Sequence, residues 1–261
     1  MNRLLFLSAE ASVPAEVHIN EIPVARLRPG VGSIVLPVHE FLCEGRNELG
    51  LVMEPQHDGR PCHVRAPSAL TANARLVLTP YGEACGSGAS HEVAALQWSV
   101  AAGQVYTRPA ERRQTLQLPV RFPRWDWMAL PRLPSLAAWN GRVEDFVFQL
   151  GEAFAMGDPG VFLRAARPRF EDLAVAYRRP CEDLQAGFSE ALGELHAQGA
   201  LRMHLLAADE LVLRPCAGGR LAECVSSDGQ PALRTEPDAN GAVHAWPMRV
   251  AFDNDDCLIV R

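Results

Sequence analysis

Apolar and polar residues alternate with a period of two along most of the first 122 residues. The clearest segments of this kind are residues 17–19, 34–38, 96–100 and 116–122. A period of two, interrupted by Pro-Gly, Asp-Gly and Tyr-Gly turns, is typical of half-buried antiparallel strands. Eight to ten short strands without a helical pattern predict an all-β sandwich over residues 1–122, either a jelly roll or an Ig-like sandwich.

The spacing of apolar residues becomes helical after residue 135. A first stripe, at intervals of three and four residues, consists of Trp139, Val143, Phe146, Val147, Leu150 and Phe154. Such a stripe predicts an amphipathic helix. Asp158 and Pro159 are typical of the start of a second helix, which runs toward Tyr177 and which Pro168 must kink or break. Pro180 opens a third helix, and Gly199 closes it.

Strand patterns return from residue 201 and finish in a hairpin over residues 243–260. Three helices followed by an antiparallel meander predict an α+β domain over residues 135–261. The chain is therefore expected to consist of two domains, a β-sandwich followed by an α+β domain.

A proline-rich segment, residues 123–134, separates the two patterns. Its prolines stiffen the chain and exclude both a helix and a central strand, so the segment is predicted to connect the domains. At its centre lie Trp125, Asp126 and Trp127. Tryptophan is over-represented at binding hot spots, which makes these three residues candidates for contact with a partner. The alternative is that the indoles pin the connector against the two domains.

One stretch of the first domain carries a more specific pattern. Residues 15–20 read Ala-Glu-Val-His-Ile-Asn, and residues 42–49 read Leu-Cys-Glu-Gly-Arg-Asn-Glu-Leu. This resembles the galactose-binding-like jelly roll of glycosidase accessory domains, where a strand ending in Asn leads into a turn and a Leu-x-x-Gly-x-Asn-x-Leu segment precedes a core strand. Gly45 can take a positive φ and Asn47 can bond its own backbone, so turn chemistry underlies the pattern.

The second domain resembles the cystatin-like, NTF2-like α+β fold in the order of its elements. The resemblance rests on a long first helix, a Gly-Asp-Pro break at residues 157–159, and a final hairpin that ends in a hydrophobic strand. It implies a pocket between the helices and the sheet. The residues expected at that pocket are Tyr177, His204 and His244, together with Asp145.

Composition and charge narrow the class of partner. The apolar fraction of 48% and the charged fraction of 21% are ordinary for a folded protein. The net charge of −6 argues against binding to nucleic acid, which requires a basic footprint. All 25 basic residues are arginine, which together with many Ala, Pro and Gly indicates a GC-rich, bacterial genome. Arg164, Arg167 and Arg169 make the second helical region basic and are further candidates for contact with a partner; the alternative is a solvated face that pairs with nearby carboxylates.

No segment suggests a secretory signal or a membrane span. The seven cysteines are scattered and lack metal-ligand or Cys-x-x-Cys spacing, so we expect reduced thiols in a cytoplasmic protein. We expect neither a metal nor a cofactor. The weak metal candidates are His57 with Cys62 and His63, and the acidic run at residues 253–256, which fits a solvated hairpin tip.

These patterns contain no catalytic signature. We therefore predict a non-catalytic bacterial binding protein, of the adaptor or immunity type, whose partner is another protein. The first alternative is an enzyme or small-molecule binder that uses an NTF2-like pocket in the second domain. The second alternative is carbohydrate binding by the jelly roll.

Overall fold

The computed structural model describes residues 3–55, 60–118, 122–133, 135–207, 210–253 and 256–261. The chain divides into two compact units, Met1–Arg124 and Trp125–Arg261.

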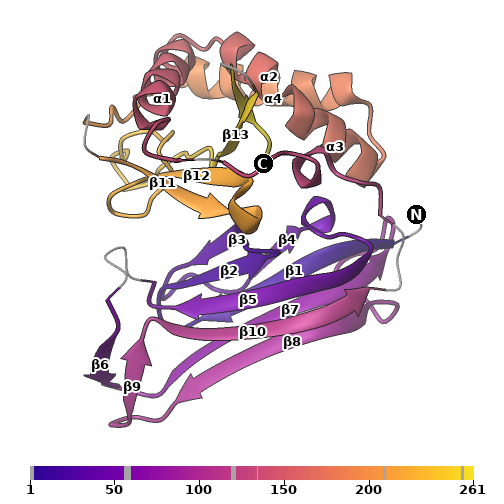
Figure 1. The fold of residues 1–261 in the computed structure, drawn as a ribbon, viewed down its shortest axis with the longest axis vertical. Coiled ribbons are helices and arrows are strands. Elements are labelled where there is room, and N and C mark those ends of the chain that lie inside the picture. Colours follow the sequence, from indigo (N-terminus) through magenta and orange to yellow (C-terminus); the bar gives the residue numbers. More distant parts are fainter. Residues whose placement is uncertain (1–2, 56–59, 119–121, 134, 208–209, 254–255) are drawn as a thin grey trace. The chain divides into compact units, whose positions relative to one another are not determined.

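The described part of the first unit consists of strands, as the period of two predicts (Figure 1). They are β1 (Arg3–Ala11), β2 (Ala15–Ile19), β3 (Ile22–Leu27), β4 (Ile34–Pro37), β5 (Gly45–Met53), β6 (Cys62–Arg65), β7 (Leu70–Pro80), β8 (His91–Val100), β9 (Val105–Arg108) and β10 (Ala110–Leu118). A single 3-10 turn at His39–Phe41 interrupts them. The pairing of these strands is antiparallel and gives sheets in the orders β4-β1-β7-β8 and β10-β5-β2-β3, with β6 and β9 as a separate ribbon.

The core of this unit lies between its two large sheets. Alternate residues of β1 are buried, namely Leu5, Leu7 and Ala9, and the same alternation recurs along β7 and β8. The opposite sheet contributes Leu49 and Leu51, which are fully buried. Strands of one sheet contact strands of the other, for example β8 with β10 and β5. Two antiparallel sheets that face each other through alternate apolar residues fit a β-sandwich broadly.

The segment that resembles the jelly-roll pattern forms a hydrogen-bonded turn structure. Asn20 and Glu21 take φ values of 51° and 63°, which suits a two-residue turn between β2 and β3. The Asn20 amide donates to the Asn47 Oδ1 (2.9 Å), which also accepts the Cys43 N–H (2.9 Å). The Asn47 amide donates in turn to the carbonyls of Cys43 (2.8 Å) and Gly45 (3.1 Å). Asn47 is 1% exposed and therefore ties the turn to the start of β5.

Replacing Asn47 with alanine is expected to lower the free energy of unfolding by about 2 kcal/mol, because buried backbone groups lose their partners. Urea titrations measure the change. The matched control is Asn73→Ala, which removes an exposed hydrogen bond to Glu10 (2.7 Å) and should change the free energy of unfolding by less than about 0.5 kcal/mol. Equal effects of the two substitutions would contradict a structural role of Asn47.

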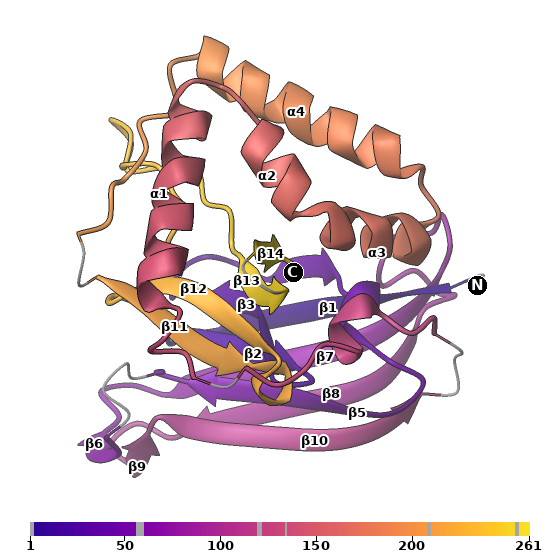
Figure 2. The ribbon, with the colours of Figure 1, turned by 45° about the horizontal axis from the view of Figure 1, so that its top comes forward.

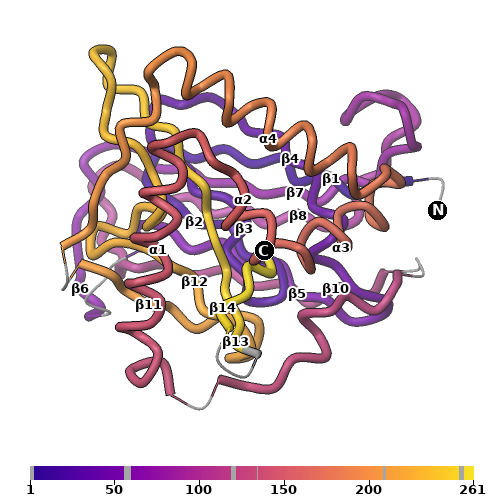
Figure 3. Tube along the Cα trace, turned by 90° about the horizontal axis from the view of Figure 1, so that it is seen from above, coloured from indigo at the N-terminus to yellow at the C-terminus, as the bar shows by residue number. Residues whose placement is uncertain are grey.

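The described part of the second unit contains helices followed by an antiparallel sheet (Figure 2). The helices are α1 (Asn140–Ala155), α2 (Gly160–Ala165), α3 (Arg167–Tyr177) and α4 (Cys181–Ala197). The strands are β11 (Leu211–Cys216), β12 (Leu221–Ser226), β13 (Arg249–Asp253) and β14 (Asp256–Ile259), which pair in the order of the chain. The tube in Figure 3 follows the path from α1 through α4 and back to β11.

The helices agree closely with the stripes in the sequence. The expected second helix is divided into α2 and α3, because Pro168 stands in the first turn of α3 and cannot donate to the preceding turn. Asp158 accepts the N–H of Gly160 (2.7 Å) at the start of α2. Gly199 has a φ of 67° just beyond α4, as expected for a glycine that ends a helix.

The helical stripes and the sheet bury one hydrophobic core. Val143, Leu150 and Phe154 of α1 are fully buried. The ring of Phe154 lies 5.6 Å from Phe162 and 4.9 Å from Trp246, which are favourable distances for tilted and edge-on aromatic pairs. The inner face of α1 therefore belongs to the buried core of this unit.

Candidate functional site

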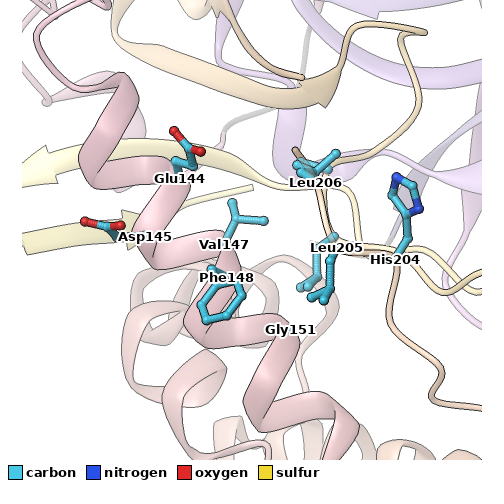
Figure 4. A pocket seen from close by; sticks show the side chains of 10 residues that line it. Glu144, Asp145, Val147, Phe148, Gly151, His204, Leu205 and Leu206 are labelled. Carbon is cyan, nitrogen blue, oxygen red and sulfur yellow. The ribbon is translucent and has the colours of Figure 1, made fainter. Parts of the chain in front are cut away.

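A hollow lies between α1 and the segment that precedes β11 (Figure 4). It has a volume of about 190 Å³. Its lining residues are Glu144, Asp145, Val147, Phe148, Gly151, His204, Leu205, Leu206, Ala232 and Leu233. We call this feature the α1 hollow.

Backbone and side-chain hydrogen bonds hold the wall and the floor of the α1 hollow in place. The His204 N–H donates to the Arg234 carbonyl (2.9 Å), so the 203–206 segment is fastened to the chain that follows β12. The Arg234 guanidinium in turn donates to the Ser226 hydroxyl (2.6 Å). Burial acts to raise the pKa of Asp228, but the Ser226 hydroxyl and the Gln230 N–H outweigh it and hold this pKa below its ordinary value. The result is a braced loop that presents Ala232 and Leu233 to the hollow.

The floor of the α1 hollow is apolar, and two large apolar side chains stand exposed at its edge. Val147, Ala232 and Leu233 are buried. Phe148 is 49% exposed and Leu205 is 61% exposed, and Figure 4 shows them on either side of the opening. Apolar side chains that gather at a concave surface are typical of interaction sites.

Two acidic residues of α1 lie beside this apolar surface. Glu144 and Asp145 both line the hollow, and Figure 4 shows the Asp145 carboxylate turned toward the side of α1 away from Leu205 and Leu206. Within the ranges that the structure describes, neither of them forms a salt bridge. Figure 4 shows the His204 ring beyond Leu205 and Leu206, on the far side from the two carboxylates. The carboxylates and the imidazole are thus separated by apolar side chains.

A second hollow, of about 280 Å³, lies across α1 from the first. Asp145 lines both hollows, and Cys257 contributes to the second one only. The centroid of the Trp139 ring lies 4.0 Å from that of Phe252, on which it stacks, and 5.0 Å from the Arg142 guanidinium. The indole of Trp139 therefore already has contacts within the unit. Burial raises the pKa of the Cys257 thiol to about 12, so the thiol is protonated and unreactive at neutral pH.

The structure brings together only part of the pocket that the sequence suggests. Asp145 and His204 line the α1 hollow. Tyr177 is half-buried at the end of α3. His244 is exposed, and its backbone N–H donates a hydrogen bond to the Thr235 hydroxyl (3.0 Å). Neither residue lines either hollow.

The tryptophans of the predicted connector are buried. Trp125 is 0% exposed and Trp127 is 6% exposed, whereas Asp126 is exposed. The Arg261 guanidinium lies 5.9 Å from the Trp125 ring. The prediction that these indoles contact a partner therefore has no exposed ring surface to support it.

The arginines of the second helical region lie on the surface of α2 and α3. Arg164 and Arg167 are exposed, and Arg169 is half-buried. Arg167 donates to Glu171 one turn later (2.9 Å). Exposed pairs at this spacing contribute little free energy. The pairing of Arg167 is what a solvated helix face would show.

The weak metal candidates are dispersed. The Cys62 thiol accepts from Arg108 Nε (3.0 Å) and the His63 ring contacts the Thr107 hydroxyl (3.1 Å), while His57 lies outside the described residues. Asn254 and Asp255 of the acidic run also lie outside them. Among the residues that the structure does describe, no group of three or more His, Cys, Asp and Glu is arranged to hold a metal ion.

Sequence reasoning missed Phe148 and Leu205. Phe148 departs from the apolar stripe of α1 and falls on its polar face, beside Gln149. The signal that could have identified Phe148 is an aromatic residue outside the apolar stripe of the helix. Leu205 lies in a segment without periodicity, so its exposure depends on how that segment folds against α1.

Comparison of the chain with protein-family models, with curated proteins and with solved structures found no match. Across the described ranges, no helix is both long and apolar enough to cross a membrane.

Proposed function

We propose that the protein is a non-catalytic binding protein, of the adaptor or immunity type, whose partner is another protein and whose contact surface is the α1 hollow. The observation that carries this proposal is the pair of exposed apolar side chains, Phe148 and Leu205, at the edge of a hollow with an apolar floor. Burial of such side chains on binding removes apolar surface from water, which is the main driving force of protein association.

The size of the hollow favours a partner protein over a small molecule. Small-molecule sites enclose about 300–1,000 Å³ and bury most of their ligand. The α1 hollow has about 190 Å³ and carries its apolar residues at the edge, where they would contact a surface larger than the hollow itself. Its polar groups also do not converge, since Leu205 and Leu206 separate His204 from the carboxylates.

Two finer assignments of fold accompany this proposal. The bond between Asn20 and Asn47 (2.9 Å) supports a jelly roll of the galactose-binding-like type for the first unit. The order of helices followed by a meander supports a cystatin-like, NTF2-like arrangement for the second unit. Fold alone does not specify function, so the proposed function depends on the α1 hollow and not on either resemblance.

A pull-down tests this proposal: the protein is immobilised and incubated with an extract of the cells that express it. The double substitution Phe148→Ser/Leu205→Ser should reduce recovery of a specific partner by about tenfold, because hot-spot side chains carry most of the binding free energy. The matched control is Met156→Ser, because Met156 is 70% exposed just beyond the end of α1 and lies outside both hollows. Circular dichroism verifies that each variant is folded.

The comparison between variants decides the outcome. Loss of the same partner from the double variant, with recovery unchanged in Met156→Ser, supports the proposal. Equal recovery by all three proteins, or no partner that the unsubstituted protein retains specifically, overturns it.

A further inference from the structure

The acidic edge of the α1 hollow indicates what kind of segment the partner presents. We propose that the partner contributes a short segment in which an apolar side chain, seated in the hollow, stands next to an arginine or lysine that pairs with Glu144. This inference rests on the proposed function and adds to it the chemistry of the ligand.

The apolar part of the segment follows from the surface it would cover. Phe148 and Leu205 flank the opening, and Val147 with Leu233 forms part of the floor. A volume of about 190 Å³ is below that of a typical small-molecule site. It suits a single side chain of a peptide, and an aliphatic or aromatic side chain there would bury apolar surface against Val147, Phe148 and Leu205.

The basic part follows from the two carboxylates. Glu144 lies at the edge of the hollow, and Asp145, the next residue of α1, adds negative charge on the adjoining side of the helix. No salt bridge neutralises either of them in the portion of the chain that the structure describes. An arginine or lysine beside the apolar side chain would form a charge-assisted pair at this edge. An acidic segment would meet like charge there, and so would a phosphate-rich nucleic acid.

Peptide selection tests the inference even while the partner is unidentified. A random peptide library displayed on phage is selected against the unsubstituted protein, against Glu144→Arg/Asp145→Arg, and against the control Glu152→Arg. Glu152 is an exposed acid on the same helix that lines neither hollow. One enriched peptide, labelled with fluorescein, is then titrated with all three proteins by fluorescence anisotropy.

The expected motif for the unsubstituted protein and for Glu152→Arg is an apolar residue adjacent to Arg or Lys. The charge-reversed variant should enrich an apolar residue adjacent to Asp or Glu and should bind the basic peptide about tenfold more weakly, since reversed charges disfavour the former ligand. Enrichment without basic residues, no enrichment, or a motif unchanged by charge reversal overturns the inference.

The two proposals fail in different ways. If the partner is lost from Phe148→Ser/Leu205→Ser but retained by Glu144→Arg/Asp145→Arg, the hollow binds a protein and the basic character of the segment is wrong. If the partner is retained by both double variants, the proposed contact surface itself is wrong.

Discussion

Replacing Asp172 with asparagine is expected to lower the free energy of unfolding by about 2–3 kcal/mol, because the buried guanidinium of Arg261 loses a charged hydrogen-bond acceptor. Arg261 is 2% exposed and Asp172 is 7% exposed. The Arg261 Nη2 donates to the Asp172 Oδ2 at 2.8 Å. Asparagine keeps the shape of the side chain and one acceptor oxygen, so the loss reports the missing charge.

A buried ion pair can be costly to break and still contribute little net stability, because both charges lose their hydration on folding. Burial raises the pKa of Asp172, and the opposing charge of Arg261 only partly offsets the effect. Replacing a buried ion pair with apolar side chains of similar size is therefore often close to neutral for stability. Removing both charges by Asp172→Leu/Arg261→Met should accordingly restore most of the stability that Asp172→Asn loses.

Urea titrations followed by tryptophan fluorescence measure these changes. Four of the five tryptophans belong to the second unit, so the signal reports mainly on its unfolding. The control is Glu171→Gln, which breaks an exposed pair with Arg167 and should change the free energy of unfolding by less than about 1 kcal/mol. A value for Asp172→Asn within that same range would show that the buried pair is dispensable.

Lowering the pH from 6.5 to 4 should destabilise the first unit by up to about 3 kcal/mol through His39 alone. His39 is 0% exposed, and its ring lies 4.7 Å from that of Phe122. Burial disfavours the charged imidazolium and lowers the pKa of His39 from 6.5 to about 4. Between these two values the unfolded chain binds a proton that the folded unit does not. The free energy of unfolding therefore rises with pH through this window, and the contribution of His39 levels off above it.

Two measurements test the role of His39. Its ring resonances in NMR spectra should titrate with a midpoint near the lowered pKa of about 4. The substitution His39→Phe keeps an aromatic ring beside Phe122 and should flatten the dependence of the free energy of unfolding on pH between 4 and 6.5. His91→Gln, at an exposed position, serves as the control, and its free energy of unfolding should depend on pH as in the unsubstituted protein. An undiminished slope in His39→Phe would assign the pH effect to other groups.

Much of the local structure is predictable from the sequence. The stripe that includes Val143, Leu150 and Phe154 predicts α1, and Pro168 predicts the break between α2 and α3. Both features depend on residues close in the chain, because helical periodicity and the missing N–H of proline act locally. The turn at Asn20 is predictable for the same reason, since asparagine tolerates a positive φ.

The candidate site is less predictable, since its parts are distant in sequence. Asp145 and His204 were expected near a pocket, and the structure places both at the α1 hollow. Tyr177 and His244 were expected there too, but they lie elsewhere on the second unit. Nothing in local periodicity specifies which segment covers which side of a helix, because that depends on the packing of the whole core.

The sequence by itself determined the order of strands and helices in this protein, because the period of two and the helical stripes depend only on residues that are close in the chain. Only the tertiary structure decided that Trp125 is buried, that Asp172 pairs with Arg261, and that Phe148 and Leu205 stand exposed around one hollow. The two members of that ion pair are 89 positions apart. These two residues come together because a shared core is buried and long loops are closed, and the same holds for the two walls of the hollow. No local pattern in the sequence specifies such contacts.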